Sequence, residues 1–504
     1  MNDHVPHDPP SAVMTSTDFD ARPGTHLPKP EQADHHSWWP LATSMLAEHD
    51  YHACLEGTLP ARLRGTLYRN GPGRFDRGGL RKNHLLDGDG MIQALTVADG
   101  AVRYRNRFVR TRKYVDESAA NRYLYDTWAS IRPDSTAGNP TNIENQAGVT
   151  VVKRHDTLYA LDDGPGIYEL DPRSLATRGP ASLDFPAGFP NLITAHTQFD
   201  AAARTWTLVS GAGDRQHVVT FNDQGRCISQ LDVPLPRPVW IHDFLMTQTH
   251  VVFVCHPLHL DPGPFLTGEA SLWDSFRWQP ELGNLIVVAR RDGNEPARVY
   301  EASTAFMWHG LNAYDHGTSI VADIVGYDNP DHAFGNDPQL RAIMAGGVGE
   351  GTCPGTVRRL VLDVGSSTAT EELVADSGHE FPYVHPERRS HRHRFGYFAT
   401  TRPDEGILPS GVARIDMTTG DRTTYGFGPS QFCIEPVFAP DPDASRAGVE
   451  GEAGWLLTIV NDGADGRAFL AIFDAQHLDD GPVCRARLDH TTPFSFHGTW
   501  SALP

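Results

Sequence analysis

Four histidines, each in its own short motif, carry the strongest chemical signal in this chain. The motifs are Thr194-Ala195-His196, Ile241-His242-Asp243-Phe244, Trp308-His309-Gly310 and Phe496-His497-Gly498. Imidazole is a frequent ligand of transition metals, but these histidines lie 46, 67 and 188 residues apart, far too widely for a metal motif on one helix. If they meet, a closed, radially repeating fold must bring four strand ends to one axis. The pattern is that of a metal at the centre of a β-propeller.

The chain contains 25 histidines, so a metal role for any one of them needs support from its context. A histidine is about five times more often a surface or hydrogen-bonded core residue than a ligand. We give that ordinary interpretation to His155, His217, His250, His256, His332, His391 and His393. The four histidines above differ because each lies near apolar or aromatic residues. Most also adjoin a glycine or an aspartate, as expected at the mouth of a central tunnel.

Short apolar runs bounded by Gly, Pro, Asn and Asp make up most of the chain from Trp38 onward. Examples are the segments 206–209, 251–254, 284–288 and 455–460. Their β-branched, aromatic and aliphatic residues predict strands, and their number predicts an all-β fold. Helical candidates are limited to segments such as 39–48 and 338–344, which would cover one face or fill connections.

The chain divides at about residue 35. Residues 1–35 hold too few apolar side chains to offset the entropy of ordering them, so we expect a flexible N-terminal arm. Residues 36–504 are expected to form a single catalytic domain. A weak repeat occurs within it, at 168–177, 413–420 and 471–475, where an aspartate follows an apolar run and precedes a turn. Such hairpins are typical of outer blade strands in propellers.

Composition narrows the possible partners and location. The net charge of −20, with no extended basic surface, argues against a nucleic-acid partner. Apolar runs never reach the roughly 18 residues of a membrane helix, and the polar N-terminus has no secretion signal, so a cytoplasmic location is expected. Six scattered cysteines without a C-x-x-C pair fit reduced, buried thiols.

Further motifs extend from about residue 50 to the C-terminus. They are Leu63-Arg64-Gly65-Thr66-Leu67-Tyr68-Arg69-Asn70-Gly71-Pro72-Gly73, His84-Leu85-Leu86-Asp87-Gly88-Asp89-Gly90, and the segments 104–111, 277–283 and 434–438. Together with the four histidine motifs, they closely resemble the carotenoid cleavage oxygenases. These motifs are specific in combination.

The resemblance implies a seven-bladed β-propeller with an α-helical and loop dome over a non-haem Fe(II). The implied iron ligands are His196, His242, His309 and His497. Imidazole suits ferrous iron, and four neutral ligands leave open positions for O2. A ligating imidazole usually donates its other N–H to a carboxylate or carbonyl.

The resemblance also implies three acids behind the ligands. The implied pairs are Asp163 with His242, Glu380 with His309, and Glu435 with His497. Asp163 stands where the family usually has glutamate. The missing methylene predicts a longer hydrogen bond to His242, or a water between the two groups.

The reaction implied is oxidative scission of a carbon–carbon double bond by O2, giving two carbonyl products. One branch of the family cleaves stilbenes and typically carries a lysine that engages the substrate phenolate. Here that position is Asp162, whose charge would repel a phenolate, so we favour a lipophilic carotenoid or apocarotenoid. A stilbene dioxygenase is the alternative, and an isomerase of the same family would have the same ligands.

Two alternatives from other classes stay open. A propeller without chemistry would be a binding scaffold with no iron. A hydrolase with a central Zn2+ would also use imidazole, whereas Ca2+ prefers oxygen ligands.

An apolar segment at the expected tunnel entrance could contact a membrane peripherally and extract a polyene from it. Its residues are Phe265, Leu266, Leu272, Trp273 and Phe276. An equally good interpretation is a packed loop within the dome.

Overall fold

The structure is a computed structural model. It describes residues 25–28, 36–132, 135, 143–211, 213–335, 338–349, 354–366, 368–376, 378–402, 407–443 and 452–503. Of the predicted flexible arm, only residues 25–28 are among these, and they contain β1 (Leu27–Pro28), which pairs with β6 (Leu80–Arg81). The arm and the single domain after it stay predictions.

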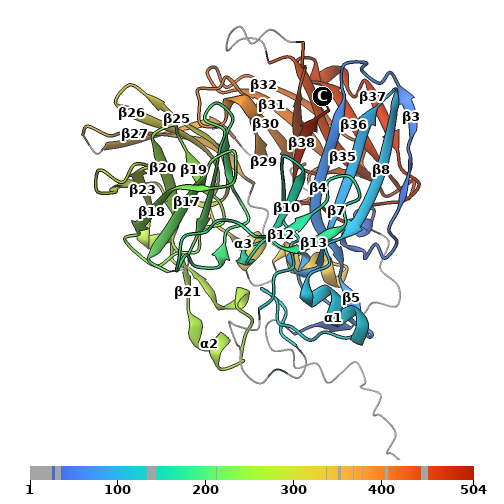
Figure 1. Ribbon diagram of the computed structural model, residues 1–504, viewed down its shortest axis with the longest axis horizontal. Helices are drawn as coiled ribbons and strands as arrows, with labels where there is room; N and C mark the ends of the chain where they lie inside the picture. Colours follow the sequence, from blue (N-terminus) through green and yellow to red (C-terminus); the bar gives the residue numbers. More distant parts are fainter. Residues whose placement is uncertain are drawn as a thin grey trace, which may run out of the picture.

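The predicted all-β character is confirmed, since most described elements are strands (Figure 1). Four sheets come from the middle of the chain. The first holds β9 (Thr150–Arg154), β10 (Thr157–Leu161), β12 (Tyr168–Leu170) and β13 (Thr177–Pro180). The second holds β11 (Gly164–Pro165), β14 (Leu192–Ile193), β15 (Gln198–Asp200), β16 (Thr205–Ser210), β17 (Arg215–Phe221) and β18 (Cys227–Pro234). The third holds β19 (Leu245–Met246), β20 (His250–Cys255), β23 (Asn284–Arg290) and β24 (Arg298–Ala302), and the fourth β25 (Phe306–His316), β26 (Ser319–Tyr327), β27 (Thr356–Asp363) and β28 (Thr368–Ala375).

Three more sheets complete the set, and two of them join both halves of the chain. The fifth holds β29 (His379–Tyr383), β30 (Phe395–Thr400), β31 (Gly411–Asp416) and β32 (Arg422–Gly426). The sixth holds β3 (Cys54–Gly57), β33 (Gln431–Cys433), β34 (Val437–Pro440), β35 (Gly454–Asp462), β36 (Arg467–Asp474) and β37 (Cys484–Arg487). The seventh holds β2 (Asp50–His52), β4 (Gly65–Arg74), β7 (Asp89–Ala98), β8 (Ala101–Phe108) and β38 (His497–Ala502). No sheet closes on itself within the described part of the chain.

The remaining described elements are short. Two small sheets hold β1, β5 (Asp76–Arg77) and β6, and β21 (Leu258–Leu260) with β22 (Phe276–Trp278). The helices are α1 (Arg112–Ala120), α2 (Pro262–Leu266), α3 (Asp331–Phe334) and α4 (Gln339–Ala342). The predicted helix at 338–344 therefore exists, whereas 39–48 forms only one 3-10 turn, Trp39–Ala42. Helices α1 and α2 lie at one end of the sheets, below them in Figure 1.

The burial of strand β20 on both faces explains why its sequence is an uninterrupted apolar run. Because side chains alternate across a strand, Val251 and Phe253 enter one buried cluster while Val252 and Val254 enter another. The first cluster includes Val218 of the second sheet, and the other includes residues of the fourth sheet. The third sheet is thus buried on both faces between its neighbours, which a run of β-branched residues suits.

The predicted hairpin repeat has a defined local cause. Asp171, Asp416 and Asp474 each accept a hydrogen bond from the backbone N–H two residues further on, at 3.0, 2.9 and 2.9 Å. An aspartate in that position replaces the backbone acceptor of a turn. The repeated aspartates therefore cap the turns between strands and have no catalytic part.

Two strands far apart in sequence meet at the seventh sheet. β38 pairs antiparallel with β4, and His497 lies opposite Asn70. The Asn70 side-chain amide donates to the backbone carbonyls of Ala147 and Thr150, each at 2.9 Å, which ties this sheet to the start of β9. No helix among the described residues is long and apolar enough to span a membrane.

Two backbone segments approach each other closely beside this junction, at Gly90 of β7. A Cβ at this position would lie 2.0 Å from the carbonyl oxygen of Ala147, and a backbone atom cannot move away cheaply. We expect Gly90→Ala to lower the free energy of unfolding by about 1–3 kcal/mol, measured by urea denaturation. The control is Gly426→Ala on β32, where a Cβ meets nothing within 4 Å. Equal stability of the two variants would contradict the packing described.

Candidate metal centre

The structure brings the four predicted histidines together from four different sheets. His196 follows β14, His242 precedes β19, His309 lies within β25 and His497 begins β38. Their ligand nitrogens all lie within 4.8 Å of one another. All four imidazoles are largely buried; the His196 side chain is the most exposed, at 14%. A site built from sheets so far apart in sequence needs the whole fold.

Three carboxylates hold three of the imidazoles by Nδ1. The pairs predicted from the sequence meet: Glu380 Oε2 lies 2.7 Å from His309 Nδ1 and Glu435 Oε1 lies 2.9 Å from His497 Nδ1. Each acid belongs to a sheet that supplies no histidine: Glu380 lies in β29, and Glu435 lies between β33 and β34. An Nδ1–H donated to a carboxylate places the imidazole lone pair on Nε2.

Asp163 contacts His242 directly, which corrects the expectation of a longer bond or a bridging water. Asp163 Oδ2 hydrogen-bonds to His242 Nδ1, and Oδ1 accepts the backbone N–H of Ala195 at 2.6 Å. The shorter side chain reaches because Asp163 lies in the turn between β10 and β11, close to the site. One carboxylate therefore holds one imidazole and the residue before His196.

Among the described residues, no carboxylate lies within hydrogen-bond distance of His196 Nδ1. The Asp243 Oδ1 atom is 3.9 Å away, too far for a hydrogen bond. Asp243 instead accepts from the backbone N–H groups of Phe244 and Gly310, each at 2.8 Å. Because Gly310 follows His309, Asp243 joins the segments that carry His242 and His309.

The four Nε2 atoms form the strongest indication of a metal. Within the part of the chain that the structure describes, His309 Nε2 and His497 Nε2 are buried without a hydrogen-bond partner, and His196 Nε2 faces His242 Nε2 at 3.2 Å. Buried polar atoms are rarely left unpaired, and converging lone pairs repel one another. A cation between them satisfies all four, so these residues could hold a transition metal.

The surroundings lower the pKa of two of the four histidines, His196 and His497. Burial and the three neighbouring imidazoles hold the pKa of His196 well below its ordinary value, and burial lowers the pKa of His497 to about 4. Burial also opposes the charge of His309, but the Glu380 carboxylate outweighs it and raises that pKa. A metal at His309 therefore competes with a proton, so its affinity should fall in acid.

Arg69 is a further member of the site that the sequence argument did not single out. Its guanidinium is fully buried and donates to Glu435 Oε2 at 2.6 Å, while the other oxygen of Glu435 holds His497. The Arg69 guanidinium also donates to the Phe496 carbonyl at 2.8 Å. The Arg69 guanidinium therefore offsets one of the negative charges of the carboxylates behind the histidines. Arg69 lies in one of the motifs that carry the family resemblance, but the sequence does not indicate its contact with Glu435.

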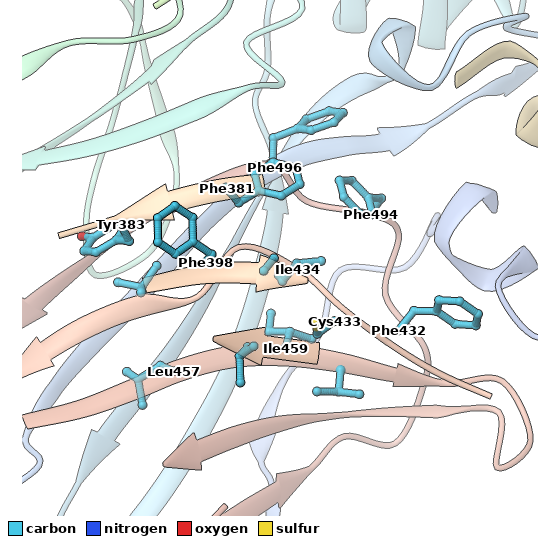
Figure 2. Packing of buried hydrophobic residues seen from close by; sticks show 14 of the residues in the cluster. Phe381, Tyr383, Phe398, Phe432, Cys433, Ile434, Leu457, Ile459, Phe494 and Phe496 are labelled. Atoms are coloured by element: carbon cyan, nitrogen blue, oxygen red, sulfur yellow. The ribbon is translucent and has the colours of Figure 1, made fainter. Parts of the chain in front are cut away.

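A cavity of about 510 Å³ adjoins the histidines. Its lining near the site includes His242, His309, His497, Val149, Trp308, Phe381, Phe494 and Phe496. Figure 2 shows Phe381, Phe494 and Phe496 close together; the rings of the first two are 5.9 Å apart and those of the last two 5.3 Å. The rest of the lining includes the polar residues Asp376, Arg402, Arg422 and Thr424. The cavity can therefore accept an apolar molecule beside the metal site.

The apolar segment near the predicted tunnel entrance is mostly packed, which agrees with the second of the two interpretations of its sequence, a packed loop. Phe265, Trp273 and Phe276 are buried, with 1%, 3% and 7% of their surface exposed. The Trp273 ring stacks on Phe334 at 4.3 Å, so these aromatic residues belong to the interior. Leu272 is partly buried, and only Leu266 of the predicted set is well exposed, at 51%.

Asp162 does not line the cavity, so its charge does not face a bound molecule there. Its side chain is buried and accepts hydrogen bonds from the backbone N–H groups of Gln146 and Asp163, at 3.3 and 2.9 Å. Burial, followed by the neighbouring Asp163, raises the pKa of Asp162 to about 7. A phenolate bound in the cavity would therefore not face Asp162, so repulsion by this residue does not separate a stilbene from a polyene.

Known proteins resemble this chain along most of its length. The family model described as retinal pigment epithelial membrane protein matches residues 42–502. The apocarotenoid-15,15'-oxygenase of Synechocystis is 28% identical over 95% of this chain and 99% of its own length. Lignostilbene-alpha,beta-dioxygenase isozyme III of Sphingomonas paucimobilis is 24% identical over 89% and 93%. Cobalt-substituted Synechocystis apocarotenoid oxygenase superposes with a TM-score of 0.84 at 27% identity, covering 93% of this chain and 98% of that structure.

Arg69→Met tests the buried pair with Glu435. Removing one partner leaves an uncompensated buried carboxylate, so we expect the free energy of unfolding to fall by about 3–5 kcal/mol. Cobalt bound per chain should also fall, because Glu435 orients His497. Urea denaturation and metal analysis measure the two effects.

The control for this prediction is Arg64→Met, which breaks an exposed ion pair with Asp99 at 3.1 Å. That loss should cost less than about 1 kcal/mol and leave cobalt binding unchanged. Similar losses in both variants would contradict a special role for Arg69.

Asp162→Asn tests the raised pKa of that carboxyl. The folded state keeps a proton that the unfolded state releases above its ordinary pKa near 4, so the contribution of Asp162 to stability falls as the pH rises from about 4 through 7. The stability of Asp162→Asn relative to the unchanged protein should therefore rise from pH 5 to pH 8. Urea denaturation at several pH values measures it, and a constant difference would refute the assignment.

Proposed function

Because the chain belongs to the carotenoid oxygenase family, that of the retinal pigment epithelial membrane protein, we propose that it is a non-haem Fe(II) dioxygenase. It cleaves a carbon–carbon double bond of a carotenoid or apocarotenoid with O2. The observation that carries the proposal is the convergence of four imidazole Nε2 atoms beside an apolar cavity, with three of the imidazoles oriented by carboxylates.

The proposed metal ligands are His196, His242, His309 and His497, with Asp163, Glu380 and Glu435 behind three of them. When bound, ferrous iron would supply the redox chemistry that activates O2. The alkene bond breaks, and each of its two carbons receives one oxygen atom, so both atoms of O2 end in the two carbonyl products. No external reductant is needed for this balance.

The protein supplies position. The aromatic and aliphatic lining of the cavity excludes water and orients one alkene bond toward the four histidines. No side chain is required to move a proton, because no proton is gained or lost by the alkene carbons. The bond that breaks is therefore determined by the shape of the cavity rather than by a general base.

A polyene substrate is favoured over a stilbene. The relative that matches over 95% of this chain is an apocarotenoid oxygenase, whereas a lignostilbene dioxygenase matches over 89% with lower identity. The cavity of about 510 Å³, with aromatic and aliphatic residues beside the histidines, suits an apolar polyene. Stilbene cleavage is the second candidate, since a stilbene dioxygenase is also among the relatives.

We also propose that the seven larger sheets are the blades of a propeller and that the short helices belong to a dome over the metal. The contacts of β38 with both β4 and β9 support this arrangement. Peripheral membrane contact is proposed through the tip formed by β21 and α2, where Leu260 and Leu266 are 44% and 51% exposed. A cytoplasmic location stays a prediction.

Metal content and cleavage test the function. The protein would be purified under low oxygen, reconstituted with ferrous iron and assayed by the loss of absorbance of an apocarotenal and of a hydroxylated stilbene. We expect about one iron per chain and cleavage of the apocarotenal. His309→Ala should lose both, whereas His155→Ala, at an exposed imidazole, should lose neither.

Each outcome of this assay has a defined meaning. Cleavage of the stilbene alone would replace the favoured substrate by the second candidate. Zinc retained in place of iron, without loss of either alkene, would overturn the dioxygenase proposal. Full activity of His309→Ala would overturn the ligand assignment.

A further inference from the structure

We propose that His332 is a positioning residue that holds Trp308 against the reaction site, and that this pair determines which double bond of the substrate is cleaved. The pattern of residues around His332 predicts only an ordinary surface or core histidine. The inference rests on the proposed function, because it concerns the placement of a polyene in the cavity described above.

The two side chains form a direct, buried hydrogen bond. The indole Nε1–H of Trp308 donates to His332 Nε2 at 2.7 Å, and 8% and 2% of the two residues are exposed. Burial lowers the pKa of His332 to about 4, so its imidazole is neutral and Nε2 can accept. Indole has only this one donor, so the bond fixes the orientation of its ring.

Trp308 lies between this histidine and the metal site. It directly precedes His309, and its ring is 5.2 Å from the ring of His242 in an edge-to-face arrangement. Both Trp308 and His332 line the cavity. Trp308 therefore lines the same cavity as His242 and His309, beside the metal site.

The remaining neighbours leave the tryptophan no other polar partner among the described contacts. Its ring packs on Phe306 at 5.0 Å, on Trp240 at 5.8 Å and on Trp273 at 6.1 Å. These apolar contacts do not direct a polar atom, whereas the hydrogen bond to His332 selects one orientation of the indole ring. Since His332 is on α3 and Trp308 on β25, the bond also joins a covering helix to a strand of the metal site.

The consequence for the reaction follows from geometry. Neighbouring double bonds of a polyene differ mainly in their distance from its ends. The enzyme must therefore select one bond by the depth to which the polyene enters and by its orientation in the cavity. A rigid ring beside the metal provides such a fixed wall. A ring free to rotate would admit the polyene in more than one register and yield products of more than one length.

The experiment compares His332→Phe and His332→Gln. Phenylalanine removes the acceptor but keeps a ring, whereas the glutamine side-chain oxygen can still accept from Trp308. Product lengths from one apocarotenal would be measured by chromatography. Polyene binding to the cobalt-loaded protein would be measured separately, by quenching of tryptophan fluorescence.

We expect His332→Phe to give a second cleavage product and weaker polyene binding, because the Trp308 ring is no longer held in the one orientation that fits the chain. His332→Gln should restore a single product. In a Trp308→Phe background, which has no indole N–H, His332→Phe should cause no further change in product ratio.

The outcomes separate this inference from the proposed function. A protein that binds cobalt but neither binds nor cleaves a polyene would overturn the substrate and, with it, the inference. Normal cleavage with an unchanged single product in His332→Phe would overturn the inference alone. A purely structural role would lower the thermal unfolding midpoint of His332→Phe without changing its products or its polyene affinity, which would also overturn it.

Discussion

The structure depends on one constraint: four imidazole lone pairs must point at a single position inside a folded protein. A neutral imidazole does so when its other nitrogen donates to a fixed acceptor, and Asp163, Glu380 and Glu435 supply that acceptor for three of the four. The same acids accept neighbouring backbone N–H groups, as Glu435 does from Gly498 at 2.8 Å. The same hydrogen bonds therefore orient the ligands and attach the sheets to one another.

This arrangement accounts for the charge buried at the centre. Three carboxylates without compensation would be costly in a dry interior, and four neutral histidines offer little relief. Arg69 offsets one negative charge, and a bound divalent cation would offset more. A bound metal would thus be part of the electrostatic balance of the fold, so its removal should loosen the same segments that its ligands hold. Stability and metal content are expected to change together in this protein.

The sequence predicted much of this site, but by two different routes. The residues alone indicated strands and four histidines at strand ends, whereas the pairing of Asp163 with His242 came from resemblance. Exposure of side chains was left open: the segment with Phe265, Trp273 and Phe276 fitted a surface or a packed loop equally well, and these three are core residues. Sequence periodicity does not indicate which distant aromatic rings pack on a loop. Here the Phe334 ring packs on Trp273 and Phe276. The Trp308–His332 bond escaped for the same reason, since its partners lie on separate elements.

The pairing of β38 with β4 has a consequence for how the chain is made. Arg69 and Phe496, which the hydrogen bonds of this junction bring together, are 427 residues apart in sequence. During synthesis the early strand emerges from the ribosome long before its partner, and the nascent chain then offers at most three of the four imidazoles. Full affinity for a metal would therefore arise only after β38 has been made and has paired with β4. Newly made protein starved of the metal should therefore differ from mature protein chiefly at this last junction.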